Sequence, residues 1–223
     1  MSERTLTHSA AKEFYDRFGS KQDAQAWYED AAIESLIRAS RFSDATSILE
    51  FGCGTGRLAE ALLDDHLPDS AVYRGIDISE TMVTLSRQRL SRFGDRATVV
   101  LHETAEVPQL AGERVDRFLS TYVLDLLTAT KIKQVVSWAS EVLEPHGLIC
   151  LAGVTRGPGV ISGIVMGAWS AISKLNPVWV GGCRPVVLSG HLDPSDWTIE
   201  HRDVVVRWGV ASEVLVARPR DHT

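Results

Sequence analysis

The stretch Ser47-Ile-Leu-Glu-Phe-Gly-Cys-Gly-Thr-Gly-Arg57 decides how the rest of the chain is interpreted. Its apolar residues predict a short buried strand, its three glycines a tight turn, and the following Leu58-Ala-Glu-Ala-Leu-Leu63 the start of a helix. Without Cβ atoms, the glycines let a ligand lie against the backbone, and the helix N-terminus offers unpaired N–H groups to its polar parts. The stretch therefore predicts a site for a nucleotide-like ligand.

Strand-like and helix-like segments alternate along the chain around this turn. Further strands are predicted at residues 71–76, 97–101, 115–120 and 148–154. Apolar residues from Ile132 to Leu143 recur at helical spacing, and Pro145-His146-Gly147 is expected to end that helix in a turn. The alternation predicts an α/β fold, a Rossmann-like doubly wound sheet that is mostly parallel and has helices on both faces.

The end of the chain breaks this parallel pattern. Two strand-like runs, residues 197–208 and 210–218, are separated by little more than Gly209. Because a parallel pair needs a long crossover, so short a link demands an antiparallel hairpin. We therefore expect an antiparallel last strand.

At 223 residues the chain is expected to form a single domain. We divide it into an N-terminal helical cap (1–44), a cofactor-binding core (45–154), an apolar insert on the substrate side (155–196) and a C-terminal hairpin (197–218). The cap is interpreted as an ordinary covering layer or as a flap that closes over a ligand at the glycine turn.

Composition narrows the classes of partner. The chain has 23 basic and 29 acidic residues and no long run of either sign, which argues against nucleic acid as a partner. Its three widely spaced cysteines lack the paired spacing of a zinc site, so we expect reduced thiols and no metal. The N-terminus shows no secretory signal, and the longest uncharged segment, residues 157–173, is shorter than the ~20 apolar residues of a membrane-spanning helix. A cytoplasmic protein without a transmembrane segment is expected.

The glycine pattern leaves the ligand open. A dinucleotide site favours G-x-G-x-x-G, whereas this chain has G-x-G-x-G with Arg57 at the third glycine position. Asp77, at the predicted tip of the second strand, can accept hydrogen bonds from both ribose hydroxyls of NAD or of another adenosine compound. An NAD-dependent oxidoreductase and a purely structural glycine turn both remain alternatives at this point.

Four segments together are more specific. Ile48-Leu-Glu-Phe-Gly-Cys-Gly-Thr-Gly56, Gly75-Ile-Asp-Ile-Ser-Glu-Thr-Met82, Val115-Asp116 leading to Ser120-Thr-Tyr122, and Val142-Leu-Glu-Pro-His-Gly-Leu148 follow one another in the chain. They resemble the successive motifs of class I S-adenosylmethionine-dependent methyltransferases, nearest to the ubiquinone/menaquinone-biosynthesis type of small-molecule methyltransferase. The resemblance covers residues 45–155. That family usually has Pro-Gly-Gly where this chain has Pro145-His146-Gly147.

The resemblance implies S-adenosylmethionine as cofactor and assigns a role to each matching position. The first strand and the glycine turn would hold its methionine part, the tip of the second strand its ribose, the next two segments its adenine, and the end of the fourth strand would lie near the sulfonium. The residues for the methionine part are Glu50, Gly52, Cys53, Gly54, Thr55 and Gly56, and Asp77 is the residue for the ribose. The residues for the adenine are Ile78, Met82, Glu103, Thr104 and Ala105, and those near the sulfonium are Thr121 and Tyr122.

Methyl transfer from a sulfonium is an in-line displacement that needs alignment and desolvation but no protein nucleophile. The catalytic residue is therefore not fixed by the sequence. Tyr122 is a weak candidate, and Asp125, His191 and His102 are weak candidates for a base. The run Ser120-Thr-Tyr-Val-Leu124 lacks the Asn/Asp-Pro-Pro-aromatic pattern of nucleic-acid and protein-glutamine N-methyltransferases, which disfavours that kind of acceptor.

The acceptor is expected to be a small molecule with apolar, aromatic or lipid-like character. Apolar residues of the insert, Met166 and Trp169 among them, would form a wall with the N-terminal aromatic residues Tyr15 and Tyr28. The same helix could instead pack on the sheet. Peripheral membrane contact stays open, the oligomeric state is not predicted, and a non-catalytic S-adenosylmethionine-binding protein is the remaining alternative.

Overall fold

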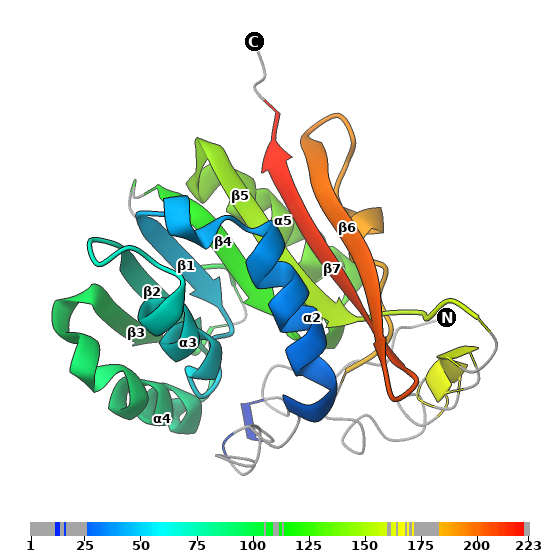
Figure 1. Ribbon diagram of the computed structural model, residues 1–223, viewed down its shortest axis with the longest axis horizontal. Coiled ribbons are helices and arrows are strands. Elements are labelled where there is room, and N and C mark those ends of the chain that lie inside the picture. Colours follow the sequence, from blue (N-terminus) through cyan, green and yellow to red (C-terminus); the bar gives the residue numbers. More distant parts are fainter. Residues whose placement is uncertain are drawn as a thin grey trace.

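The computed structural model describes residues 12–13, 16, 26–104, 106–108, 112, 114–159, 162–163, 165–167, 169, 171 and 183–220. Their central feature is a seven-stranded sheet with the order β3-β2-β1-β4-β5-β7-β6 (Figure 1). The strands are β1 (Ser47–Phe51), β2 (Val72–Asp77), β3 (Ala97–Leu101), β4 (Val115–Thr121), β5 (Leu143–Val154), β6 (Trp197–Arg207) and β7 (Val210–Pro219).

Strands β1 to β5 pair in parallel, whereas β7 runs antiparallel to both of its neighbours, β5 and β6. Trp208 and Gly209, both at positive φ, form the tight link between β6 and β7. The predicted Rossmann-like sheet with an antiparallel last strand is thus confirmed. In this topology the carboxyl ends of β1, β2 and β4 meet at one edge, which is where α/β folds bind ligands.

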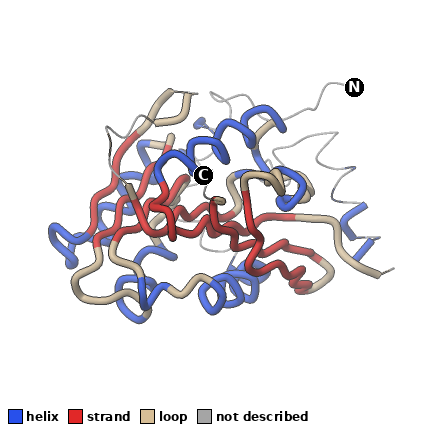
Figure 2. The backbone as a smooth tube through the Cα atoms, turned by 90° about the horizontal axis from the view of Figure 1, so that it is seen from above, coloured by secondary structure: helices blue, strands red, loops and turns tan. Residues whose placement is uncertain are grey.

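Helices cover both faces of the sheet (Figures 1 and 2). The α-helices that precede β3 in the chain pack on one face, and the helix that follows β4 packs with a 3-10 segment on the other. The helices are α2 (Ala26–Ala39), α3 (Arg57–Asp65), α4 (Glu80–Leu90) and α5 (Ala129–Val142), and the 3-10 segments are η2 (Phe42–Asp44), η3 (Ser91–Arg96), η4 (Leu124–Leu126) and η6 (Leu188–His191).

The sequence sets the starts of two helices through side-chain caps. The Ser79 hydroxyl accepts the N–H of Met82 at the start of α4, and Thr128 accepts the N–H of Lys131 at the start of α5. Each cap satisfies one N–H group that the first helical turn leaves unpaired.

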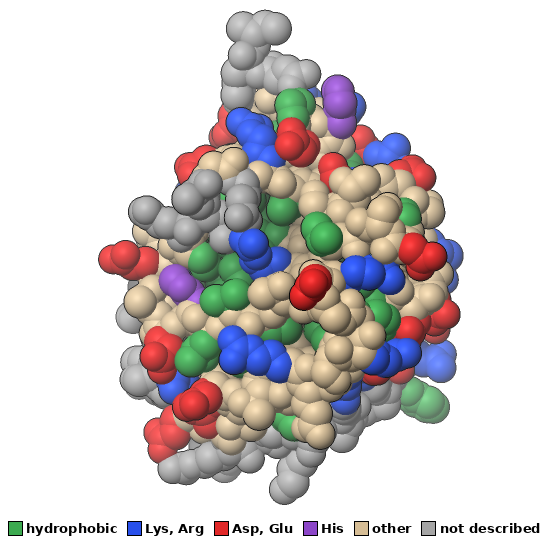
Figure 3. Space-filling view, turned by 90° about the vertical axis from the view of Figure 1, so that its left-hand side faces the viewer, with side chains coloured by type: hydrophobic (Ala, Val, Ile, Leu, Met, Phe, Trp, Pro, Cys, Tyr) green, Lys and Arg blue, Asp and Glu red, His purple; other side chains and the backbone are tan. Residues whose placement is uncertain are grey.

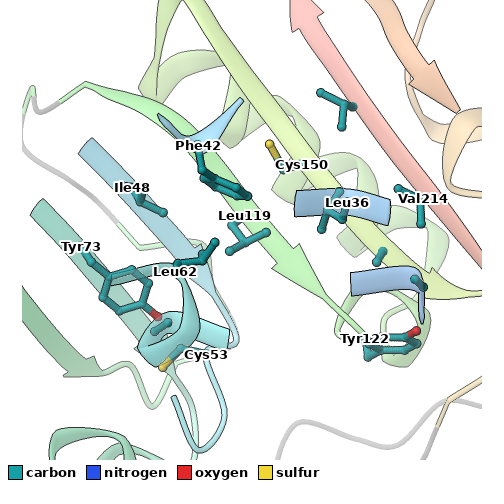
Figure 4. Close-up of a cluster of buried hydrophobic side chains, with 14 of the residues drawn as sticks. Leu36, Phe42, Ile48, Cys53, Leu62, Tyr73, Leu119, Tyr122, Cys150 and Val214 are labelled. Atoms are coloured by element: carbon teal, nitrogen blue, oxygen red, sulfur yellow. The ribbon is translucent and has the colours of Figure 1, made fainter. Parts of the chain in front are cut away.

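The core lies between the sheet and these helices. Figure 4 shows the cluster beneath α2 and α3, where Leu36 and Leu62 face Ile48, Leu119 and Val214 of the sheet. On the opposite face, Trp138 of α5 packs edge-on against the rings of Phe51 and Phe118. Both faces of β1 and β4 are therefore buried.

A buried arginine ties α2 to the sheet. Arg117 of β4 is 6% exposed, and its guanidinium donates to the carbonyl oxygens of Ser40 at 2.8 Å and Arg41 at 2.8 Å, just after the helix ends. The Arg41 carbonyl also accepts the N–H of Asp44, whereas for the Ser40 carbonyl the guanidinium supplies a donor that the end of the helix lacks. Arg117 thus fixes one end of the N-terminal helix.

The turn predicted at Pro145-His146-Gly147 is wrong. Helix α5 ends at Val142, Leu143 already belongs to β5, and the three residues lie within that strand. Val115 pairs with Leu143 but Arg117 pairs with Leu148, so the extra residues form a bulge against β4. Pairing of the flanking residues with β4 overrides the local turn signal.

Parts of the predicted domain organisation fall outside the described residues. In the cap, Lys12, Glu13 and Asp16 are helical, and in the insert so are residues 162–163, 165–167, 169 and 171. The division into cap, core, insert and hairpin stays a prediction. In the described part of the chain, no helix has the length and apolarity needed to cross a membrane.

Candidate functional site

The glycine turn connects β1 to α3 at the carboxyl edge of the sheet. Gly52, Gly54 and Gly56 have φ values of 78°, 54° and 76°, in the left-handed region that favours glycine. A Cβ on Gly52 would overlap Val123, and one on Gly56 would lie 2.5 Å from Ser86 Oγ. The turn therefore requires glycine for both conformation and space.

Asp77 lies at the tip of β2 directly beside this turn. Its Oδ2 accepts the N–H of Gly54 at 2.8 Å, and its Oδ1 accepts the N–H of Ser79 at 2.9 Å. Burial raises the pKa of Asp77, and the N–H groups of Ser79, Gly54 and Ile78 oppose that rise. Because the two carboxylate oxygens offer about four acceptor positions between them, the side chain can still accept a hydrogen bond from a ligand.

The other predicted adenosine contacts lie on the α4 side. Ile78 is half-buried, and Met82, on the first turn of α4, is 1% exposed. Glu103 and Thr104 are exposed in the loop after β3. Ala105 lies outside the described residues.

Two residues of the N-terminal cap contact this region. Ser79 donates to Asp16 at 2.6 Å, and Lys12 lies 3.4 Å from the Glu103 carboxylate. The cap therefore contacts both segments that the family resemblance assigns to the adenine.

Glu50 and Cys53 are buried beneath the turn. The Tyr73 hydroxyl donates to Glu50 Oε2 at 2.5 Å. Burial raises the pKa of Glu50 to about 8 and that of Cys53 above its ordinary value. Figure 4 shows the Tyr73 hydroxyl pointing toward Cys53. Thr55 is also buried and accepts a hydrogen bond from Arg89 of α4.

Tyr122 follows half-buried Thr121 at the tip of β4, in an unusual backbone conformation. Its φ is 55°, although it is not glycine. Its N–H bonds to the Ala152 carbonyl at 2.8 Å, and its hydroxyl donates to Ser212 Oγ of β7 at 2.9 Å. These contacts hold the ring at the carboxyl edge, and burial raises the pKa of its hydroxyl.

Three aromatic side chains from distant segments meet at this tip. The ring of Tyr28 on α2 lies edge-on to Tyr122, with centroids 5.8 Å apart, and 6.2 Å from the ring of Trp169. Trp169 Nε1 donates to the Cys183 carbonyl at 3.0 Å, and Met166 packs in the same core cluster. The structure thus brings together Tyr28, Tyr122 and Trp169, and Met166 belongs to the core cluster on the same face of the sheet. Tyr15 lies outside the described residues.

Asp125 is fully buried beside this aromatic cluster. Its Oδ2 accepts the N–H of Val154 at 2.9 Å, and its Oδ1 makes no hydrogen bond of normal geometry with any described residue. Burial raises the pKa of Asp125 to about 6, while its bond from Val154 and the nearby Cys183 thiol lower it. Asp125 therefore joins the tips of β4 and β5 and adds negative charge beneath the cluster.

The two histidines predicted as weak base candidates lie elsewhere. His191 ends η6, which packs with α5 on the face opposite α2 and α3. His102 Nε2 lies 2.8 Å from the Glu106 carbonyl and 2.9 Å from Thr104 Oγ1, within its own loop. The aromatic cluster includes neither residue.

Sequence reasoning missed the acidic pair at the start of α2. Arg57, directly after the glycine turn, lies 2.7 Å from Asp30 and 3.9 Å from Glu29. The Glu29 side chain is 14% exposed, and burial raises its pKa to about 7. Arg57 occupies the position of the third glycine in a dinucleotide-binding turn. This difference from the glycine pattern was the only sequence signal for Arg57, and no signal distinguished its acidic partners.

Among the described residues, no group of three or more His, Cys, Asp or Glu side chains is arranged to hold a metal ion.

Part of the chain is similar to known methyltransferases. Residues 48–147 match the family model described as "Methyltransferase domain". A relative from Geobacillus sp. (strain WCH70), named an uncharacterized methyltransferase, is 28% identical over 138 residues. That match spans 62% of this chain and 61% of the relative.

Two solved structures share the fold over nearly the whole chain. The N-methyltransferase NodS from Bradyrhizobium japonicum WM9, in complex with S-adenosylhomocysteine, is 17% identical and has a TM-score of 0.69, covering 95% of this chain and 99% of its own. The 4+2 cyclase SpnF is 14% identical and has a TM-score of 0.71, covering 98% of both chains.

Proposed function

We propose that this chain, whose residues 48–147 match a methyltransferase domain, is a class I S-adenosylmethionine-dependent methyltransferase that transfers a methyl group from that cofactor to a small acceptor with an apolar body. One observation carries the proposal. The glycine turn, the Asp77 carboxylate and the aromatic cluster lie on the adjacent strands β1, β2 and β4, at the same edge of the sheet.

The residues present fit the cofactor. The carboxylate of Asp77 at the tip of β2 suits a ribose hydroxyl, and the backbone from Gly52 to Gly56 suits the methionine part. The aromatic faces of Tyr28 and Tyr122 suit a sulfonium cation. Glu50 and Cys53 support the turn from beneath.

When bound, S-adenosylmethionine supplies a methyl group that is already activated on a sulfonium. The protein then has to align the acceptor with this methyl group and exclude water, and alignment alone contributes about 7–11 kcal/mol in well-oriented reactions. Tyr28, Tyr122 and Trp169 would exclude water and contact the apolar body of the acceptor. This mechanism uses no nucleophile from the protein.

A small-molecule acceptor agrees with the surface of the described residues. On the face drawn in Figure 3, basic and acidic side chains are interspersed, which supports a small molecule over nucleic acid. Cys53, Cys150 and Cys183 are buried free thiols, which supports a reducing compartment such as the cytoplasm.

Calorimetric titration with S-adenosylhomocysteine and with NAD tests the cofactor. We expect the first to bind more tightly, and preference for NAD would replace the proposal with an oxidoreductase. Incubation with methyl-labelled S-adenosylmethionine and fractionated metabolites and lipids tests the transfer. Since the fold is shared with a cyclase, binding without any labelled product would favour a role other than methyl transfer.

A further inference from the structure

Glu29 lies beside the aromatic cluster to which the proposed function assigns the methyl acceptor. It follows Tyr28 on the first turn of α2, and Tyr28 contacts both Tyr122 and Trp169. A hydrogen bond from Tyr28 reaches its carboxylate. Glu29 therefore lies at the border of the aromatic cluster, and its 14% exposure leaves it accessible to a ligand.

The nearby cation Arg57 forms only a long ion pair with this carboxylate. Arg57 binds Asp30 at 2.7 Å, whereas its distance to Glu29 is 3.9 Å, beyond a hydrogen bond. Asp125, the second carboxylate of the region, is fully buried and tied to Val154. Glu29 is thus the carboxylate that can reach a ligand, and Asp125 supplies negative charge behind it.

We propose that Glu29 is the proton acceptor of the reaction and that the methyl acceptor is a basic amine on an apolar body. This inference rests on the proposed methyl transfer. Carboxylates beside aromatic faces attract an ammonium ion, by charge and by cation–π contact, and repel a phenolate. The buried carboxylate of Asp125 beside the cluster adds to the same preference.

The proton and electron balance is simple. The ammonium form of the amine gives one N–H proton to the Glu29 carboxylate, which frees the nitrogen lone pair. The N–C bond then forms as the C–S bond of the donor breaks, and the electron pair of that bond stays on sulfur as a neutral thioether. The positive charge of the sulfonium passes to the methylated nitrogen.

The charges around Glu29 suit this task near neutral pH. Burial raises its pKa to about 7, with a contribution from Asp125 and Asp30, while Tyr28 and Arg57 oppose the rise. Tyr122 and Cys183, the other titratable groups coupled to this region, both have pKa values raised by burial, so they are neutral in this range. A base with a pKa near the working pH is the most effective.

The first experiment identifies the methylated atom. Metabolites of the source organism are split on a cation exchanger into a retained fraction, which holds amines, and a flow-through, which holds phenols, acids and alcohols. Each fraction is incubated with the protein and methyl-labelled S-adenosylmethionine. We expect a labelled N-methyl product from the retained fraction. Label on oxygen or carbon would overturn the amine inference and leave methyl transfer intact, whereas no label despite S-adenosylhomocysteine binding would overturn the proposed function itself.

The second experiment tests Glu29 on that acceptor. In E29Q we expect kcat to fall by about 100-fold or more, with S-adenosylhomocysteine affinity and Tm unchanged, and the rise of kcat/KM with pH near 7 to disappear. E29D should recover part of the rate. E34Q on the same helix, with a side chain 71% exposed, is the matched control and should behave as wild type. An E29Q protein that keeps its rate and its pH profile would overturn the assignment.

Discussion

The Oδ2 atom of Asp77 lies 2.8 Å from the backbone nitrogen of Gly54 and accepts its N–H group. This bond joins the tip of β2 to the turn after β1. Since Ser79 donates to the second oxygen, the carboxylate is fixed before a ligand arrives, and little ordering is left for binding. The contact makes one side chain responsible for both the shape of the turn and the proposed ribose contact.

Replacing Asp77 by alanine should weaken S-adenosylhomocysteine binding by a factor of roughly 10 to 100, because hydrogen bonds to charged groups contribute about 1.5–3 kcal/mol. Isothermal titration calorimetry measures the loss. Asp69→Ala is the control, since the Asp69 side chain is fully exposed and lies 3.7 Å from Arg96. Equal affinity of the two variants would remove Asp77 from the proposed cofactor site.

Gly52→Ala should lower the free energy of unfolding by about 2–5 kcal/mol, from left-handed backbone strain plus overlap with Val123. Gly94→Ala separates these two causes. Gly94 has a φ of 58° and a ψ of −133°, and no atom lies within 4 Å of an added Cβ, so its loss should come from backbone strain alone, about 1–3 kcal/mol. Urea unfolding of both variants gives the comparison, and equal losses would show that the overlap with Val123 is relieved without cost.

The buried Glu50 should make stability fall as pH rises. Its pKa is about 8 in the folded protein against an ordinary 4.5, so between these values the folded state holds a proton that the unfolded chain has released. The stabilisation is complete below pH 4.5 and is lost as pH rises through 8. Glu50→Gln cannot ionise, and its Tm should therefore vary less with pH and gain on wild type toward pH 8. Parallel Tm profiles of variant and wild type would contradict this account.

Arg117→Met should lower the free energy of unfolding by about 1–3 kcal/mol, because it leaves the carbonyl of buried Ser40 without this donor, whereas the Arg41 carbonyl keeps the N–H of Asp44. Arg38→Met is the matched control, since the Arg38 side chain is 70% exposed. Differential scanning calorimetry of both proteins checks the difference. A loss for Arg117→Met no larger than for Arg38→Met would mean that water replaces the guanidinium at the end of α2.

Local patterns were enough to predict the sheet and the position of the glycine turn. Alternating strands and helices, the Ser79 cap and the short link at Gly209 are signals carried by neighbouring residues. The Pro145-His146-Gly147 signal failed because pairing with β4, a strand nearly thirty positions earlier, outweighed it. Local chemistry predicts an element until a long-range partner competes for the same residues.

The proposed acceptor region was harder to predict because its residues come from segments that are far apart in the sequence. Tyr28, Tyr122 and Trp169 meet because α2 and the insert cross the tip of β4, and no periodicity in the sequence encodes that crossing. Asp125 reads as an ordinary loop aspartate until its burial is known. Glu29 could not be distinguished from Asp30, since only the fold decides which of the two Arg57 binds.

The matched family segment, residues 48–147, includes the glycine turn and Asp77, whereas Tyr28, Glu29, Trp169 and Ser212 all lie outside it. Strand β7 runs antiparallel beside β5, so its first residues lie at the same edge of the sheet as the tip of β4. Ser212 can therefore accept the hydrogen bond from Tyr122. Three of the residues proposed to contact the acceptor, Tyr28, Glu29 and Trp169, therefore belong to the flanks, whereas the proposed ribose contact belongs to the middle of the chain. Substitutions in the flanks are expected to change the acceptor while they leave the Asp77 carboxylate and the glycine turn in place.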